Sequence, residues 1–167
     1  MPWEFQFTRR VEFSETDMAG IMHFSNFFRF MEATETAFMR SLGLSVLLQK
    51  SGLNFCLPRV HADCDYVAPL RFEDEVLVRL LVEKKGTRSV TYQFRFYKAN
   101  EAREVARGRV TLACAECGPD GVLKGATLPK ELAEKLHEAP AEVLTERLSS
   151  SRSETTSGRT LKHCSSK

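Results

Sequence analysis

The chain has 167 residues, a length that suits a single domain with an ordinary hydrophobic core. Its net charge is +2, and its charged residues, 28% of the total and of both signs, form no basic stripe that would bind a nucleic-acid backbone. No apolar run reaches the roughly 18 residues of a membrane span, residues 1–10 lack the apolar core of a signal peptide, and the five cysteines have no disulfide-framework spacing. We therefore expect a cytoplasmic protein with reduced thiols and with neither nucleic-acid nor membrane partners.

The N-terminal part is predicted to fold as strand, loop and helix. Apolar and polar residues alternate over residues 5–13, which predicts a strand, and the polar stretch over residues 14–20 predicts a loop. From Phe24 the apolar residues step by three or four positions, which predicts a long helix that ends near Gly43. A second, short helix is predicted over residues 45–50. The long helix has so much aromatic surface and so few charges that we expect other elements to surround it.

The middle of the chain is predicted to form strands. Apolar and polar residues alternate, with some irregularity in the last case, in four segments: 60–66, 76–82, 90–96 and 105–115. The connections over residues 84–88 and 98–103 are short, so the last three strands should form an antiparallel meander. One sheet curled around the long helix would bury that helix on most sides, which gives an α+β architecture.

The C-terminal part is predicted to add one helix and a tail. Pro129 is typical of a first helical position, which predicts a helix over residues 128–136. Beyond Pro140 the chain becomes rich in Ser, Thr, Lys and Arg, and such a segment cannot offset its ordering entropy. We expect one folded domain over residues 1–137 and a disordered polar tail over residues 138–167.

The loop before the long helix holds the candidate chemistry. Asp17 lies three residues before Gly20, and the helix is predicted to start soon afterwards, at Phe24. The first N–H groups of a helix have no partners inside it, and the helix dipole favours negative charge there. The amide of Phe24 or a neighbour would stabilise the oxyanion that forms when a thioester carbonyl is attacked, an effect of about 3–4 kcal/mol per donor. Asp17 would supply the nucleophile or the base, and the alternative is a carboxylate that only caps the helix dipole.

Residues 11–35 combine an acidic residue, a glycine turn and an aromatic helix start in one short motif. Its positions are Asp17, Gly20, Ile21 with Met22, His23 with Phe24, and Asn26 with Phe27. This motif resembles the signature of the 4-hydroxybenzoyl-CoA thioesterase family of hotdog proteins. The resemblance covers residues 5–116, and Pro58–Val60 and Asp65–Pro69 are similar to the family's second strand and the turn that closes it. It implies a hotdog fold, in which a five-stranded antiparallel sheet is wrapped around a long central helix.

The resemblance implies an acyl-CoA thioesterase that hydrolyses its substrate to a free acid and coenzyme A without a cofactor. Asp17 would be the catalytic carboxylate, the backbone N–H of Phe24 would polarise the thioester carbonyl, and Gly20 would let the backbone approach the substrate. Asp17 would either attack the carbonyl directly or activate water, and the sequence leaves both routes open. Family members commonly form dimers or tetramers with sites between subunits, which implies a homodimer or homotetramer. Phe27, where many members have Tyr, and Met18, where Pro or Ala is commoner, leave the acyl group open.

Several further residues are predicted to bind the substrate. The candidates are His23, Asn26, Phe27, Glu32 and Val60. Structural alternatives apply to most of them: His23 at a helix start is commonly structural, and Asn26 can hold the loop by hydrogen bonds to the backbone. Glu32 and Glu35 lie one helical turn apart and can equally be solvated or paired at an interface.

Coenzyme A carries phosphates, so basic residues are expected somewhere at its site. Lys84, Lys85 and Arg88 flank Gly86 in the turn between two predicted strands, where glycine permits close backbone approach. We predict that these three residues bind coenzyme A. The alternative is that they are ordinary solubilising turn charges.

Three other hypotheses compete with this interpretation. Four residues of zinc-ligand type occur as two pairs, His61 with Cys64 and Cys114 with Cys117, but a spacing of three along a strand points side chains to opposite faces, so we expect no metal. A hotdog hydratase or dehydratase would use Asp with His in a different local motif. An acyl-CoA-binding regulatory module without turnover would have no need of Asp17.

Overall fold

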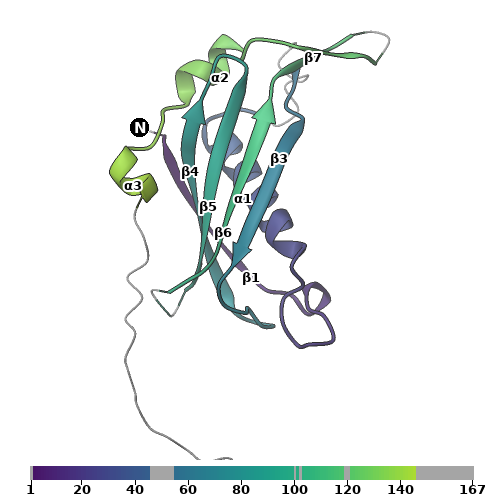
Figure 1. Cartoon of the computed structure of the whole chain (residues 1–167), viewed down its shortest axis with the longest axis vertical. Coiled ribbons are helices and arrows are strands. Elements are labelled where there is room, and N and C mark those ends of the chain that lie inside the picture. The colour runs from purple at the N-terminus through teal and green to yellow at the C-terminus, as the bar shows by residue number, and fades with distance from the viewer. Residues whose placement is uncertain (1, 46–54, 100, 102, 119–120, 146–167) are drawn as a thin grey trace, which may run out of the picture.

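Five strands form one antiparallel sheet in the computed structural model, which describes residues 2–45, 55–99, 101, 103–118 and 121–145. In their order across the sheet the strands are β1 (Glu4–Arg10), β4 (Glu75–Lys85), β5 (Ser89–Lys98), β6 (Glu104–Ala113) and β3 (Arg59–Tyr66). Every neighbouring pair is antiparallel. The consecutive strands β4, β5 and β6 form the predicted meander (Figure 1).

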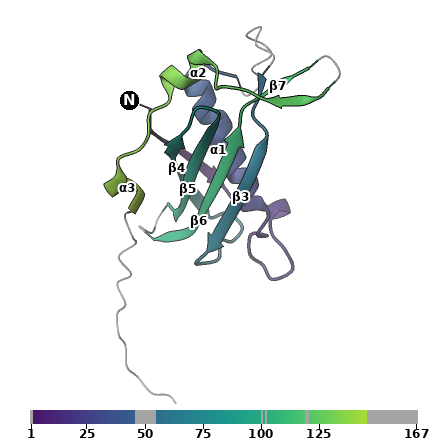
Figure 2. The same cartoon turned by 45° about the horizontal axis from the view of Figure 1, so that its top comes forward.

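The long helix α1 (Asn26–Ser41) lies across one face of this sheet (Figures 1 and 2). Its buried residues step by three or four positions: Asn26, Phe27, Phe30, Met31, Thr34, Glu35, Phe38 and Met39. They pack against the alternate residues of the strands that face the helix, of which Val78, Tyr92 and Phe94 are 1% exposed or less. The apolar faces of the strands, with period two, and of the helix, with period 3.6, therefore pack together in one core.

The other side of α1 is open to solvent in the single chain. Arg29, Glu32 and Arg40 are exposed along it. The sheet thus covers one side of the helix, whereas the sequence predicts burial on most sides. The helix also begins at Asn26, after a turn that contains Phe24.

A second, smaller sheet is a feature that the sequence does not predict. It contains β2 (Phe55–Cys56), β7 (Ala115–Cys117) and β8 (Leu123–Gly125) in the order β2-β7-β8. The run predicted as one strand over residues 105–115 is divided at Cys114 into β6 and β7. The β7 hairpin extends away from the main sheet (Figure 2). Apart from Ser45, the helix predicted over residues 45–50 lies outside the described residues.

The predicted C-terminal helix is present as α2 (Lys130–Lys135), with Pro129 at its N-cap. Lys135 donates a hydrogen bond from Nζ to the carbonyl of Leu42 at 2.8 Å, and so it satisfies a carbonyl group at the end of α1. No helix among the described residues is long and apolar enough to cross a membrane.

Ordered chain continues past the predicted domain boundary at residue 137. A short helix, α3 (Ala141–Thr145), is bound to the face of the sheet opposite α1. Arg95 of β5, which is 1% exposed, donates from Nη2 to the carbonyls of Val143 and Leu144 at 2.6 and 3.0 Å. A buried guanidinium at the carbonyl end of a helix satisfies groups that otherwise lack partners. The tail predicted from residue 138 is thus ordered as far as Thr145, and residues 146–167 lie outside the described residues.

Candidate active site

The loop between β1 and α1 is held in place by a buried glutamate. Glu15 is at the end of η1 (Phe13–Glu15), is 5% exposed, and forms an ion pair with Arg9 of β1. Its carboxylate also accepts a hydrogen bond from the N–H of Glu12 at 2.9 Å. Its backbone carbonyl accepts two more, from Asn26 Nδ2 at 2.7 Å and from the N–H of His23 at 2.9 Å. These bonds fix the loop to the start of α1.

Asp17 lies at the tip of this loop, in a tight turn. The N–H of Gly20 donates to the carbonyl of Asp17, and the N–H of Asp17 donates to the carbonyl of Ile21, each at 2.9 Å. Gly20 has a φ of 71°, a left-handed conformation that glycine adopts without the steric cost of a Cβ atom. The exposed Asp17 carboxylate accepts a hydrogen bond at Oδ1 from the N–H of Ala19 at 2.8 Å. Within the described part of the chain its Oδ2 has no hydrogen-bond partner and is available to a substrate.

A cavity of about 490 Å³ opens beside Asp17. Its lining is mostly apolar and comes from the loop, the start of α1, the end of β3 and the segment that follows β3: Asp17, Ile21, Met22, Phe24, Phe27, Tyr66, Val67, Ala68, Pro69 and Leu70. The N–H of Met22 donates to the carbonyl of Leu70 at 2.7 Å, which joins the two sides. A mostly apolar cavity of this size with one carboxylate is typical of a small-molecule site.

Phe24 presents an unused backbone donor at this site. Its N–H donates no hydrogen bond to the part of the chain that the structure describes. Its carbonyl accepts hydrogen bonds from Tyr66 Oη at 3.2 Å and from the N–H of Phe27 at 3.3 Å. The peptide groups around Phe24 are therefore held in position while the N–H stays available, as an oxyanion donor requires.

Tyr66 is a site residue that the sequence interpretation missed. Its ring packs edge-to-face against Phe27, with 5.0 Å between ring centroids. Burial, together with the neighbouring Cys64, raises the pKa of Tyr66 to about 12, so the hydroxyl is a neutral donor at pH 7. The alternation of β3 places Tyr66 on the α1 side of the sheet, and this pattern could have pointed to it.

Of the predicted substrate-binding residues near the start of α1, one lines the cavity and two do not. Phe27 lines the cavity. Asn26 is buried and bonded to the Glu15 carbonyl, which is the structural role that the sequence left open. His23 does not line the cavity. Its Nδ1 lies 2.8 Å from Ser25 Oγ, and its ring centroid lies 4.4 Å from that of Phe24.

Glu32 and Val60 lie away from Asp17. Glu32 lines a different cavity, of about 180 Å³, between α1 and β3. There Arg59 Nη2 lies 2.9 Å from Glu35 Oε2 and 3.8 Å from Glu32 Oε1. Burial raises the pKa of Glu35, and Arg59 opposes that shift. Val60 is 62% exposed on β3 and lines neither cavity.

The predicted coenzyme A residues lie at the far end of the sheet from Asp17 in the same chain. β4 starts beside the loop that contains Asp17, where the N–H of Val11 donates to the carbonyl of Asp74, and ends at Lys85. At about 3.4 Å per residue, the length of β4 separates the two ends by roughly 34 Å. Lys85 donates from Nζ to carbonyls of the α2 region at 2.9 Å, while Lys84 and Arg88 are exposed. One chain therefore does not bring these residues to the Asp17 cavity.

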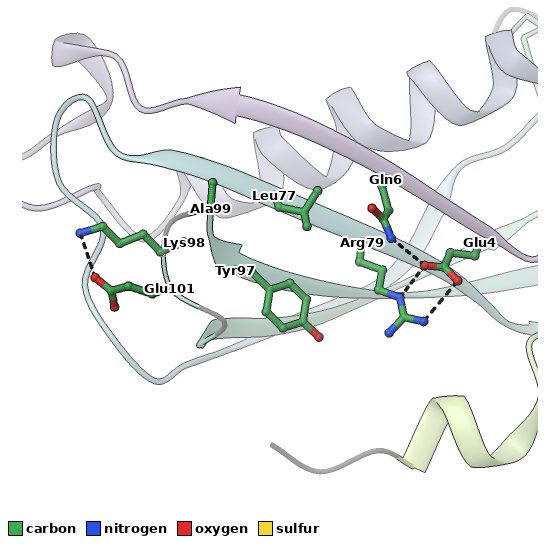
Figure 3. A pocket seen from close by; sticks show the side chains of 8 residues that line it. All are labelled: Glu4, Gln6, Leu77, Arg79, Tyr97, Lys98, Ala99 and Glu101. Atoms are coloured by element: carbon green, nitrogen blue, oxygen red, sulfur yellow. Dashed lines mark hydrogen bonds and ion pairs between the residues drawn. The ribbon is translucent and has the colours of Figure 1, made fainter. Parts of the chain in front are cut away.

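Another cavity, of about 330 Å³, lies on the sheet face opposite α1 (Figure 3). Its charged groups pair with one another: Arg79 Nε lies 2.7 Å from Glu4 Oε1, and Lys98 Nζ lies 3.7 Å from Glu101 Oε1. The hydrogen bond from Arg79 holds the pKa of Glu4 below its ordinary value against the effect of burial. Its charges are paired, and no residue of the loop between β1 and α1 lines it, which distinguishes this cavity from the Asp17 site.

The residues of zinc-ligand type do not gather in one place. Cys64 is paired with Gly108 across β3 and β6, so Cys114, just past the end of β6, lies about six residues, or roughly 20 Å, further along the chain. His61 Nε2 instead lies 2.8 Å from Asp63 Oδ2, on the outer face of the sheet. No group of three or more His, Cys, Asp or Glu residues within the described ranges is arranged to hold a metal ion.

Comparison with known proteins identifies the family. The family model described as the thioesterase-like superfamily matches residues 11–136. The chain belongs to the thioesterase-like superfamily. A putative esterase of Aquifex aeolicus is 33% identical over 133 residues, which cover 79% of this chain and 97% of that protein.

Two solved structures resemble this thioesterase in fold. A 1,4-dihydroxy-2-naphthoyl-CoA thioesterase from Synechocystis has a TM-score of 0.73 at 27% identity, over 80% of this chain and 95% of that chain. A gentisyl-coenzyme A thioesterase has a TM-score of 0.67 at 26% identity, over 77% of this chain and 98% of that chain. The predicted family, the hotdog fold and the assignment as a thioester hydrolase are confirmed.

Replacing Asn26 in this thioesterase should loosen the loop that contains Asp17. Asn26→Ala removes the buried bond to the Glu15 carbonyl, and we expect the free energy of unfolding to fall by about 1–2 kcal/mol. Thioesterase activity, measured as kcat/KM, should fall with it because Asp17 follows Glu15 in the same loop. Ser25→Ala is the matched control, since Ser25 is exposed and, among the described residues, its hydroxyl bonds only to the neighbouring His23 side chain. Equal urea-unfolding curves for the two variants would contradict the anchoring role.

Proposed function

We propose that this thioesterase hydrolyses aromatic acyl-CoA thioesters, with Asp17 as the catalytic carboxylate and the N–H of Phe24 as the oxyanion donor. The observation that carries the proposal is a carboxylate with a free Oδ2, within the described residues, in the lining of an apolar cavity. Its volume of about 490 Å³ suits a compact acyl group with the thioester at the cavity mouth.

The aromatic lining of the cavity supports an aromatic acyl group. Phe24, Phe27 and Tyr66 contribute rings, and rings gain from edge-to-face contacts in addition to the burial of apolar surface. The two thioesterases of similar fold are named for naphthoyl and gentisyl thioesters, which are both aromatic. The Tyr66 hydroxyl, at the same cavity, can also hydrogen-bond to a ring substituent.

The reaction breaks the bond between the acyl carbon and sulfur. In one route Oδ2 of Asp17 attacks the acyl carbon, the thiolate of coenzyme A leaves and is protonated, and water hydrolyses the resulting mixed anhydride. In the other route Asp17 takes a proton from the water that attacks. In both, negative charge develops on the carbonyl oxygen, where a positioned backbone N–H stabilises it. The products are the free acid and coenzyme A, and no cofactor takes part.

We also propose that the site is shared between two copies of the chain. Lys84 and Arg88 are exposed but distant from Asp17 in one chain, so a second copy would have to supply them to coenzyme A. Among the described residues β3 is the edge strand of the main sheet, so its outer backbone edge is available for pairing. β3 also carries the exposed Val60. The exposed side of α1 would be covered in the same assembly.

The test is a coenzyme A release assay across acyl groups. Purified protein is given benzoyl-CoA and 1,4-dihydroxy-2-naphthoyl-CoA beside hexanoyl-CoA and palmitoyl-CoA, and the released thiol is measured. We expect kcat/KM to be higher for the aromatic thioesters by roughly tenfold or more. Equal or faster hydrolysis of the aliphatic thioesters would overturn the aromatic specificity. Tight binding without turnover of any thioester would instead support a regulatory binding protein.

A further inference from the structure

Two cysteines from distant parts of the sequence meet at the second sheet. Cys56 of β2 and Cys117 of β7 are separated by 61 positions, yet their sulfur atoms lie 3.2 Å apart. The register explains the meeting: Cys56 is opposite Ala115, so Cys117 is its diagonal neighbour on the same face of the strand pair. Both side chains are partly accessible to solvent.

We propose that Cys56 and Cys117 are a reversible redox site that forms a disulfide with a low-molecular-weight disulfide as the oxidant. The thiolate of one cysteine attacks the small disulfide and releases one small thiol, which leaves a mixed disulfide. The second cysteine then attacks its sulfur and releases the second small thiol. The protein loses two protons and two electrons, and the small disulfide is reduced to two thiols.

The geometry requires little movement for this bond to form. A disulfide has about 2.05 Å between its sulfur atoms, so the observed pair must close by about 1 Å. Burial, together with the neighbouring Cys117, raises the pKa of the Cys56 thiol to about 11, so Cys56 is a neutral thiol at pH 7. Two sulfur atoms can stay in contact in that state without charge repulsion.

The other described cysteines lack such a partner. Cys64 lies on the edge strand β3, opposite Gly108 of β6. Cys114 is buried and donates from its thiol to the carbonyl of Thr127 at 3.5 Å. The strand register therefore determines which two cysteines can form the disulfide.

Oxidation should stabilise the fold without changing the catalytic loop. The disulfide would link β2 to β7 across a long intervening segment, and restricting the unfolded chain in this way stabilises the folded state. In the reducing compartment that the sequence predicts, the dithiol is the resting form, and an oxidising change would convert it. The second sheet lies away from the Asp17 loop (Figure 1), so catalysis should continue in both forms.

The experiment treats the purified full chain with oxidised glutathione and follows thiols, peptides and thermal unfolding. We expect the loss of two of the five thiols, a peptide in which Cys56 is linked to Cys117, and a rise in Tm of roughly 5–10 °C that dithiothreitol reverses. Cys56→Ser and Cys117→Ser should each abolish the linked peptide and the rise in Tm, while the control Cys64→Ser should retain both. Stable glutathione adducts without the linked peptide, or a linked peptide with any other pairing, would overturn the proposal.

Discussion

Asp17→Asn is expected to lower kcat for acyl-CoA hydrolysis by roughly 10²–10⁴-fold. The amide is neither a nucleophile nor a base, so both routes to product lose their reacting group. The fold should be unaffected, because Asn retains an oxygen that accepts the hydrogen bond from the N–H of Ala19. Substrate affinity should also be largely retained, since the cavity lining is otherwise apolar. The measurement is coenzyme A release, with substrate binding followed separately by calorimetry.

Glu134→Gln provides the matched loss of a carboxylate elsewhere on the molecule. Glu134 is exposed on α2, and its Oε1 lies 3.7 Å from Lys130 Nζ. Its replacement should leave kcat unchanged. Near-wild-type hydrolysis by Asp17→Asn would refute a catalytic Asp17 in either route. Repeated turnover of the wild-type enzyme in ¹⁸O-labelled water then tests the anhydride route. Label in the Asp17 carboxylate supports a mixed anhydride that water attacks at the Asp17 carbon. Label in the product acid alone is expected both for water activation and for an anhydride that water attacks at the substrate carbonyl.

The elements that depend on local pattern could be predicted from the sequence. The period-two strands and the period-3.6 helix each contain apolar residues on one face, and burial of those faces against each other leaves few arrangements. Asp17, Gly20 and Phe24 lie within one short segment, so their proximity follows from chain connectivity. The helix boundary was less predictable, because the turn that contains Phe24 continues the apolar spacing of the helix that follows.

The features that depend on contacts between distant segments could not be predicted. The two-residue strand β2 has no period of its own, and it exists because Cys56 and Phe55 pair with β7. The sequence pattern shows Arg95 only as a polar position of a strand. In the structure α3 covers Arg95, whose guanidinium donates hydrogen bonds to two carbonyls of that helix. The distance between Lys85 and Asp17 could not be predicted from the sequence either. The length of β4 decides that distance, and it separates the two residues within one chain.

Gly108→Ala should lower the free energy of unfolding by about 1–3 kcal/mol, although Ala is normally the better strand residue. Gly108 lies in β6, where α1 crosses the sheet. A Cβ atom built there would lie 2.0 Å from Met31 Cε and 2.9 Å from the backbone carbonyl oxygen of Asp63. The end of the Met31 side chain can move, but the Asp63 carbonyl belongs to β3, which is paired to β6 through its backbone.

Gly125→Ala is the control for this prediction, because it places the same methyl group on β8 with nothing within 4 Å. Its effect should stay within about 0.5 kcal/mol. Urea unfolding at one fixed protein concentration measures both variants and keeps any assembly equilibrium constant. The double variant Gly108→Ala with Met31→Val shortens the obstructing side chain, but we do not expect it to restore stability. The Asp63 carbonyl still opposes the new methyl group, and the smaller side chain leaves a gap in the core. Equal stabilities for Gly108→Ala and Gly125→Ala would contradict the close approach of α1 to the sheet at Gly108, which is the contact that sets how near the helix lies to β6.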